Sequence, residues 1–180
     1  MSAREGQDLY YSVWATAWGA VGAVVGPRGL SRLVLPHYQP KDLADLLAWE
    51  HRGAARDDKP FGELTQLSRD YFNGRAVDFS PVPCELPAES SFAGKVLRAA
   101  RAIPYGQTRS YHILAETIGL PDAARAVATA LSKNRIPLVI PCHRVIYADG
   151  GMGGFSAPGG TRQKARLLEL EQKNARPSPA

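Results

Sequence analysis

The side chain best suited to chemistry in this chain is the thiol of Cys142, in the segment Ile-Pro-Cys-His-Arg-Val-Ile at residues 140–146. A cysteine reacts as its thiolate, so a nucleophilic role requires a nearby proton acceptor or positive charge. His143 and Arg144 follow at once and offer one group of each kind. A buried, inert cysteine beside a core histidine is nevertheless the more common arrangement. The segment alone therefore leaves both a nucleophile and a structural cysteine open.

Two prolines fix the backbone of the short apolar run that leads to this cysteine. Residues 136–140 are Ile-Pro-Leu-Val-Ile, and Pro141 follows directly. Because proline fixes φ and cannot continue a helix, the run predicts a short strand that holds Cys142 rigidly. Neighbouring strand residues point to opposite faces, so adjacency in sequence does not by itself place His143 beside the sulfur. A glycine-rich segment, GGMGGFS at residues 150–156, follows as a predicted loop.

A second cysteine, Cys84, lies in the proline-rich segment DFSPVPCELPAESS at residues 78–91, which lacks helical periodicity. We predict that this segment links an N-terminal domain, residues 1–86, to a C-terminal domain, residues 87–180. No histidine neighbours Cys84 in the sequence, so we interpret it as an unactivated linker thiol. Two cysteines cannot form a disulfide framework, and the four histidines show no metal-ligand spacing. We therefore expect no metal, no other cofactor and a reducing, cytoplasmic location.

The N-terminal part contains an uncharged stretch, Leu9 to Pro27, that is long enough to span a bilayer as a helix. Its glycine, aromatic and β-branched residues instead favour paired strands, which we expect from about Tyr10 to Leu35 with a turn near Trp18-Gly19. We expect no signal peptide and no membrane association. A second turn is predicted at residues 26–29, and helices are predicted over residues 41–52 and 63–72, which makes this an α+β domain.

The two predicted domains carry opposite net charge. From Pro87 onward the chain has 13 Lys and Arg against 6 Asp and Glu, whereas the first 86 residues have 9 against 11. A basic half joined to a slightly acidic half is typical of a nucleic-acid-binding domain on a scaffold domain. The basic half has helical patterns at Phe92 to Ile103, capped by Ser90 or Ser91, at Ser110 to Ile118 and at Asp122 to Lys133. The last two form a helix-turn-helix pattern, which also occurs as a plain packing unit.

The third of these helices has an unusually smooth surface. Its sequence, DAARAVATALSK, sets the large cation Arg125 among alanines. Small residues let a helix approach another surface closely. That surface is either another helix or a narrow nucleic-acid groove, in which Arg125 would fill space or contact phosphate.

Several motifs stand between Ile103 and Glu171. They are IPYGQTRSYHILA at 103–115, AARAVATAL at 123–131, Asn134, IPCHRVI at 140–146, GGMGGFS at 150–156 and KARLLELE at 164–171. Together they resemble one known family, the O6-alkylguanine-DNA alkyltransferases, also called methylated-DNA–protein-cysteine methyltransferases. The resemblance implies a strand-rich N-terminal α/β domain of RNase H type, followed by a helical domain of winged helix-turn-helix type.

The resemblance implies a single-turnover methyltransferase that repairs DNA by moving an alkyl group from O6 of guanine onto its own Cys142. In the family the cysteine is activated by the following histidine through a bound water, with a glutamate behind it, and these positions are His143 and Glu171. Tyr111 matches the tyrosine that donates a proton at the guanine ring. Asn134 matches the asparagine that braces the site.

The expected partner is double-stranded DNA containing O6-alkylguanine, bound by a monomer through the minor groove with the damaged nucleotide rotated out of the duplex. Arg125 matches the arginine that takes the vacated place in the base stack. The implied location is the cytoplasm, at the nucleoid in a prokaryote, or the nucleus in a eukaryote. The other residues expected at the DNA are Ala124, Ala126, Ala128, Tyr111 and His112, and those expected at the alkylguanine are Val145, Phe155 and Ser156.

Three departures from the family pattern bear on these expectations. Ala128 and Thr129 stand where many members have glycine, and Arg135 stands where proline usually follows the asparagine. The loop FSAPGGTRQK at residues 155–164 is longer than the common form. Two alternatives stay open: a protein that binds alkylguanine without removing the group, and a DNA-binding regulator. The acceptor cysteine argues against the first, and the Pro-Cys-His-Arg-Val site against the second.

Overall fold

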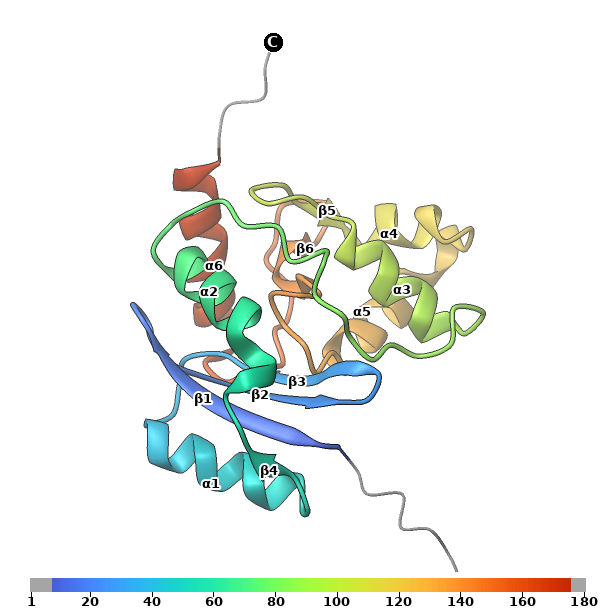
Figure 1. Cartoon of the computed structure of the whole chain (residues 1–180). Helices are drawn as coiled ribbons and strands as arrows, with labels where there is room; N and C mark the ends of the chain where they lie inside the picture. The colour runs from blue at the N-terminus through green and yellow to red at the C-terminus, as the bar shows by residue number, and fades with distance from the viewer. Residues whose placement is uncertain (1–7, 176–180) are drawn as a thin grey trace, which may run out of the picture.

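The computed structural model describes residues 8–175, shown in Figure 1. The first half is built on an antiparallel sheet of β1 (Tyr10–Thr16), β2 (Gly19–Gly26) and β3 (Gly29–Val34), with the short β4 (Ala55–Arg56) pairing parallel to β1 in the order β3-β2-β1-β4. The strands predicted between Tyr10 and Leu35 and both turns are confirmed. No helix in the described part of the chain is long and apolar enough to cross a membrane.

Glycine is required where β2 turns into β3. Gly29 has φ +102°, and a Cβ at this position would lie 2.6 Å from the backbone carbonyl of Pro83. The close approach lets Leu30 pair with the 83–85 segment, because its N–H donates to the Pro83 carbonyl at 2.8 Å and its own carbonyl accepts from Glu85 N–H at 2.8 Å. The predicted linker is therefore tied to the sheet.

Two helices cover opposite faces of this sheet (Figure 1). Helix α1 (Pro40–Glu50) places Leu43 and Leu47 against Gly22 of β2, where a Cβ would come within 2.9 Å of both leucines. Helix α2 (Gly62–Phe72) follows the short 3₁₀ turn η1 (Lys59–Phe61) and is fastened to β1 by a hydrogen bond from Trp14 Nε1 to Ser68 Oγ, 2.7 Å. Both helices were predicted, with ends displaced by at most two residues.

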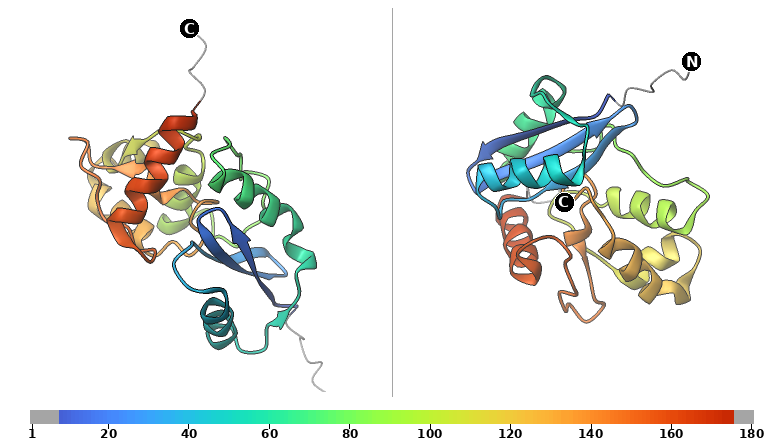
Figure 2. Two further views of the ribbon diagram at one scale, coloured as in Figure 1. Left: turned by 90° about the vertical axis from the view of Figure 1, so that its left-hand side faces the viewer. Right: turned by 90° about the horizontal axis from the view of Figure 1, so that it is seen from below.

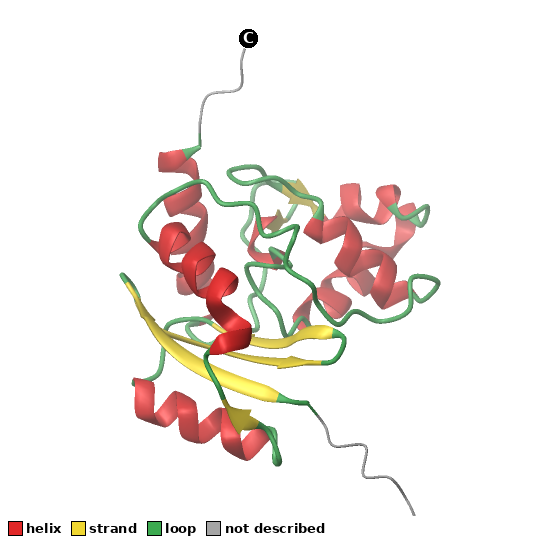
Figure 3. Cartoon of the chain, in the orientation of Figure 1, coloured by secondary structure: helices red, strands yellow, loops and turns green. Residues whose placement is uncertain are grey.

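The second half is mainly helical, as Figure 3 shows. Residues 78–91 contain no helix, and α3 (Phe92–Arg101) begins after Ser91, whose hydroxyl accepts from Gly94 N–H at 3.0 Å. Ser110 caps α4 (Tyr111–Thr117) in the same way, through Ile113 N–H at 3.1 Å. The other elements are β5 (Arg109–Ser110), α4 (Tyr111–Thr117), η2 (Pro121–Ala123), α5 (Ala124–Ser132), η3 (Cys142–Arg144), β6 (Val145–Ile146), which pairs parallel with β5, and α6 (Gly160–Asn174).

The predicted strand at residues 136–140 is wrong. The segment is a series of turns: Leu138 has φ +70°, and Ile140 N–H donates to the Ile136 carbonyl at 2.9 Å, which an extended strand could not allow. The two prolines do prevent a regular helix, but the chain satisfies its polar groups by turning back on itself. Cys142 then begins a 3₁₀ turn, so the opposite-face rule for strands does not apply to it and His143.

One hydrophobic core runs through both halves of the chain. It includes side chains from β1 and α2 in the first half and from α3, α5 and α6 in the second. Figure 2 shows how α6, which is late in sequence, returns to lie against the N-terminal part. Gln163 Nε2 near the start of α6 donates to the Pro36 carbonyl, 3.3 Å, in the same contact. A smaller core lies between the sheet and α1.

Candidate active site

Cys142 is held at the start of η3 by the side chain of Asn134. The Asn134 amide Nδ2 lies 3.2 Å from the Cys142 Sγ and 2.9 Å from the Ile140 carbonyl, and its Oδ1 accepts from Ile136 N–H at 3.0 Å. One amide thus fixes the turns that replace the expected strand and also donates to the sulfur. Cys142 is only 8 % exposed, so its thiol is recessed rather than presented on the surface.

The carboxylate of Glu171 is the centre of a buried network behind the cysteine. Its Oε1 accepts from Tyr71 OH at 2.7 Å and Arg144 Nη2 at 3.0 Å, and lies 2.7 Å from His143 Nε2. Its Oε2 accepts from Arg144 Nε at 2.9 Å and from Gly106 N–H at 3.0 Å. Burial alone would raise the pKa of Glu171, but the hydrogen bonds and charges of His143 and Arg144 outweigh it and lower the pKa to about 2. The group is therefore an anion at neutral pH.

This anion fixes the protonation of His143. A carboxylate only accepts hydrogen bonds, so the short contact requires the His143 proton to be on Nε2. Burial lowers the pKa of His143, which keeps the imidazole neutral at pH 7, against the opposing effect of Glu171. The other ring nitrogen, Nδ1, is buried and has no hydrogen-bond partner within the described residues. His143 is thus prepared to accept a proton at Nδ1.

The ionisation of Glu171 predicts a specific acid sensitivity. Its folded pKa of about 2 is below the ordinary value of 4.5, so the stability it contributes is complete above pH 4.5 and is lost as the pH falls toward 2. We expect the difference in unfolding midpoint between the wild-type chain and Glu171→Gln to shrink over that interval. Thermal unfolding followed by circular dichroism at several pH values measures it. A difference independent of pH would contradict the assignment.

The sulfur borders a pocket of about 290 Å³ beside α5 and the glycine-rich loop. The loop needs glycine at residue 153, because a Cβ there would lie 2.5 Å from the Tyr111 hydroxyl. The Tyr147 ring lies at 5.2 Å from the Tyr111 ring, centroid to centroid. Tyr147, Ser132 and Leu131 were not expected at this site. The full lining is Tyr111, Ala128, Leu131, Ser132, Cys142, Tyr147, Gly154, Phe155 and Ser156.

Lys164 is a second unexpected contributor, fully buried within α6. Its ammonium donates to the Val145 carbonyl at 2.6 Å and the Gly154 carbonyl at 3.4 Å, and lies 5.8 Å from the Tyr111 ring centroid. Burial lowers the pKa of Lys164 to about 8, while Cys142 acts in the opposite direction. Burial likewise raises the pKa of the Cys142 thiol, and Asn134 and the Lys164 charge oppose it. Val145 itself is buried and does not line the pocket.

The residues expected at DNA lie on and beside α5. Arg125 and Ala126 are exposed, Ala124 and Ala128 are half-buried, and Ala128 also lines the pocket. Val127 and Leu131 anchor the opposite face of α5 in the core. His112 is exposed on α4, 3.4 Å from Glu116. The smooth helix therefore presents Arg125 to solvent, three residues before Ala128, which lines the pocket at Cys142. Within the described residues no cluster of potential metal ligands is present.

Comparison with known proteins matches residues 91–173 to the family model "6-O-methylguanine DNA methyltransferase, DNA binding domain". A methylated-DNA–protein-cysteine methyltransferase of Mycolicibacterium paratuberculosis is 45% identical over 114 residues, which is 63% of this chain and 66% of that protein. The aligned segment therefore spans about two thirds of that relative.

Solved structures match over nearly the whole chain. The O6-methylguanine methyltransferase of Mycobacterium tuberculosis superposes with a TM-score of 0.74 and 32% identity, over 95% of this chain and 96% of that one. The M. tuberculosis OGT in complex with DNA gives a TM-score of 0.73 and 32% identity, over 92% and 94% of the two chains.

Proposed function

The chain belongs to the methylated-DNA–protein-cysteine methyltransferase family of DNA repair proteins, and we propose that its alkyl acceptor is Cys142, used once per chain on O6-alkylguanine in duplex DNA. The observation that carries this proposal is the position of the Cys142 sulfur. The sulfur borders a pocket and accepts a hydrogen bond from Asn134. Cys142 also begins the turn that contains His143, whose Nε2 lies 2.7 Å from Glu171 Oε1. This arrangement supplies a nucleophile, a proton acceptor and an anion that orients the acceptor.

The reaction exchanges one covalent bond for another. The thiol proton passes to His143 Nδ1, through one water molecule, and the thiolate attacks the alkyl carbon in line with its bond to O6. The new bond joins sulfur to carbon, the carbon–oxygen bond breaks, and its electron pair goes to the guanine. Glu171 remains an anion throughout and stabilises the imidazolium. No step regenerates the thiol, so each chain acts once.

The departing guanine must gain a proton as the bond breaks. We assign this donation to the hydroxyl of Tyr111, a residue that lines the pocket, with the Lys164 ammonium 5.8 Å from the ring centroid and so able to stabilise the phenolate that forms. Burial raises the pKa of Tyr111, so the hydroxyl holds its proton in the free protein. The proton is then replaced from solvent, while His143 returns its proton to solvent.

A recessed sulfur requires the damaged nucleotide to leave the base stack. The small residues of α5 suit a close approach to the minor groove, and exposed Arg125 is placed to fill the gap left by the base. We further propose that residues 1–86 form a domain of RNase H type and residues 87–180 a winged helix-turn-helix domain. We also propose that the chain acts as a monomer in the compartment that contains the DNA, which in a prokaryote is the cytoplasm, at the nucleoid.

Intact mass spectrometry tests the function directly. After incubation with duplex DNA containing O6-methylguanine, each chain should gain the mass of one methylene unit, and peptide mapping should locate it on Cys142. DNA with ordinary guanine is the control. Binding without a mass change would favour the non-catalytic alternative, and methylation at Cys84 would overturn the assignment of the acceptor.

Arg125→Ala should slow transfer from duplex DNA by about 10- to 100-fold, because the extruded state loses the side chain that replaces the base. Transfer from a single-stranded oligonucleotide should change little, since no stack has to be opened. Single-turnover kinetics on both substrates measure the ratio, with Arg162→Ala, an exposed arginine of α6, as the control. An equal loss on both substrates would contradict the proposed role of Arg125.

A further inference from the structure

We infer that Tyr71, from the N-terminal half of the chain, is a positioning residue for the proton acceptor of the reaction, acting on His143 through the carboxylate of Glu171. The inference rests on the proposed function of that site. It assigns to the first half of the chain a side chain that shapes the chemistry at Cys142, in addition to its role in packing.

The geometry of the Tyr71 hydroxyl is specific. It donates to Glu171 Oε1 at 2.7 Å and lies 3.4 Å from His143 Nε2, across 100 and 72 residues of sequence. Tyr71 is completely buried on α2, and its ring meets Phe72 and Tyr105 edge to face. Burial, followed by the charge of Glu171, holds the pKa of Tyr71 well above its ordinary value. The hydroxyl therefore keeps its proton and donates it in the hydrogen bond to Glu171.

This donor acts on the same oxygen that His143 uses. Tyr71, His143 and Arg144 all form hydrogen bonds to Oε1. Each of these hydrogen bonds therefore reduces the negative charge that acts on the other two groups. Without the Tyr71 hydroxyl, Glu171 would stabilise a charged His143 more strongly, and the position of the Glu171 carboxylate would be less well fixed. The Tyr71 hydrogen bond thus lowers the proton affinity of His143.

The other groups that face His143 act on its titration independently of Tyr71. Glu171 favours the charged imidazole, whereas the cations Arg144 and Lys164 disfavour it. Removing the Tyr71 hydroxyl leaves these charges in place and changes only the strength with which Glu171 acts. We therefore expect the pKa of His143 to rise in Tyr71→Phe.

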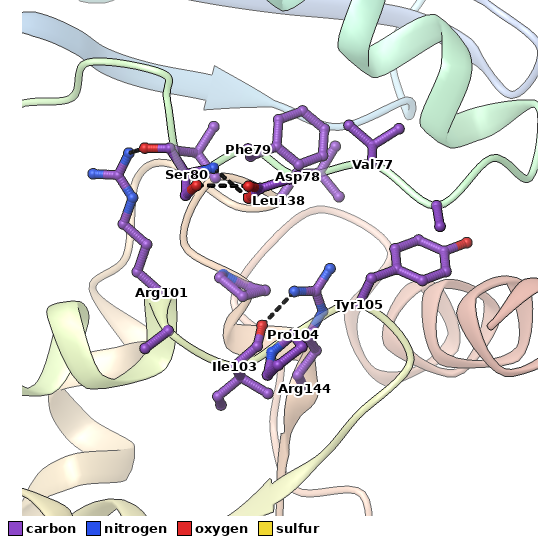
Figure 4. A pocket seen from close by; sticks show the side chains of 14 residues that line it. Val77, Asp78, Phe79, Ser80, Arg101, Ile103, Pro104, Tyr105, Leu138 and Arg144 are labelled. Atoms are coloured by element: carbon purple, nitrogen blue, oxygen red, sulfur yellow. Dashed lines mark hydrogen bonds between the residues drawn. The ribbon is translucent and has the colours of Figure 1, made fainter. Parts of the chain in front are cut away.

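Tyr105 provides a matched control beside the same network. Its ring lies 5.9 Å from the Tyr71 ring, and the Arg144 guanidinium lies 5.7 Å from the Tyr105 centroid. Its hydroxyl is buried but has no hydrogen-bond partner within the described residues. Figure 4 shows this hydroxyl directed away from Arg144, at the wall of a cavity of about 480 Å³. Tyr105→Phe therefore removes a hydroxyl from the same surroundings without removing a contact to Glu171.

The experiment compares wild type, Tyr71→Phe and Tyr105→Phe over the pH range from about 5 to 9, where a histidine titrates. Single-turnover methyl transfer should show the acidic limb displaced to higher pH only in Tyr71→Phe. At the acidic end its rate should fall by about threefold or more, and the difference should diminish as the pH rises. NMR titration of labelled histidine should show the same displacement for His143.

Two results would overturn the inference. A rate loss of equal size at every pH, together with a lower unfolding midpoint, would show that Tyr71 only stabilises the fold. A His143 titration unchanged from wild type would do the same. Because the NMR titration does not require methyl transfer, failure of the proposed function appears separately, as a wild-type protein that never gains mass.

Discussion

Cys142→Ser should lose methyl transfer by at least about 10³-fold, the largest effect of any single substitution in this chain. The serine hydroxyl fits the same space and can still accept from Asn134 Nδ2. It is nonetheless a far weaker nucleophile, because a neutral imidazole does not deprotonate it appreciably. The variant should fold, since the sulfur contributes little to the core beyond its volume. Single-turnover assays with labelled O6-methylguanine in duplex DNA measure the loss.

The same variant should still bind alkylated DNA, which separates chemistry from recognition. Cys84→Ser is the control, because Cys84 lies apart from the pocket and donates nothing to the Glu171 network. An Arg101 nitrogen does lie 2.8 Å from the Cys84 sulfur, a positive group that was not expected from the sequence. Burial raises the pKa of Cys84 as it does that of Cys142, so the two thiols differ in that only Cys142 lines the pocket and is followed by His143. Methyl transfer by Cys142→Ser at the wild-type rate would contradict the assignment of Cys142 as the acceptor.

Glu171→Gln should both destabilise the protein and slow methyl transfer. The amide keeps the shape of the carboxylate but leaves the buried Arg144 cation without its partner, which costs about 3–5 kcal/mol in comparable buried pairs. It also presents an N–H group to donors that need an acceptor. With His143 no longer oriented, we expect transfer to fall by about 10²- to 10³-fold. Chemical denaturation and single-turnover kinetics give the two quantities.

Helix α6 contains a control for this substitution. Glu169 is exposed and pairs with Lys173 at 2.6 Å, so Glu169→Gln changes the same charge on the same helix at the surface. Exposed pairs of this kind contribute about 0–1 kcal/mol. We expect wild-type transfer and nearly wild-type stability. If Glu169→Gln and Glu171→Gln proved equivalent, the buried network would have no special part in the reaction.

The regular elements could be predicted because local rules determine them. The hydroxyls of Ser91 and Ser110 cap their helices, and the glycines at 19 and 29 have the positive φ values that tight turns favour. Periodic leucines identified α1 and α2. The prediction for residues 136–140 failed because their proline and aliphatic composition also suits a strand. The turns found there depend instead on the left-handed Leu138 and on Asn134, which accepts from Ile136 N–H and donates to the Ile140 carbonyl.

The site could be predicted only where its members share one stretch of sequence or match a family motif. Tyr71 gave no signal, since a tyrosine on the apolar face of a helix is ordinarily a packing residue. Gly106 contributes a backbone N–H, which no residue type reveals. Arg144 and Lys164 belong to the sequence motifs at 140–146 and 164–171, but a buried cation can be recognised only when its partners are known. These contacts form between segments far apart in the chain, so they require the fold.

Four separate stretches of chain converge on the single carboxylate of Glu171: helix α2, the turn at Gly106, the 142–144 turn and α6 itself. A polypeptide cut ahead of α6 would keep Cys142, His143 and Arg125 but would lose Glu171 and Lys164. Its imidazole would have no anchor and Arg144 no counterion, so the thiol would behave like any other. The orientation of His143 therefore depends on α6, which brings Glu171 into contact with a side chain 100 residues away in the sequence.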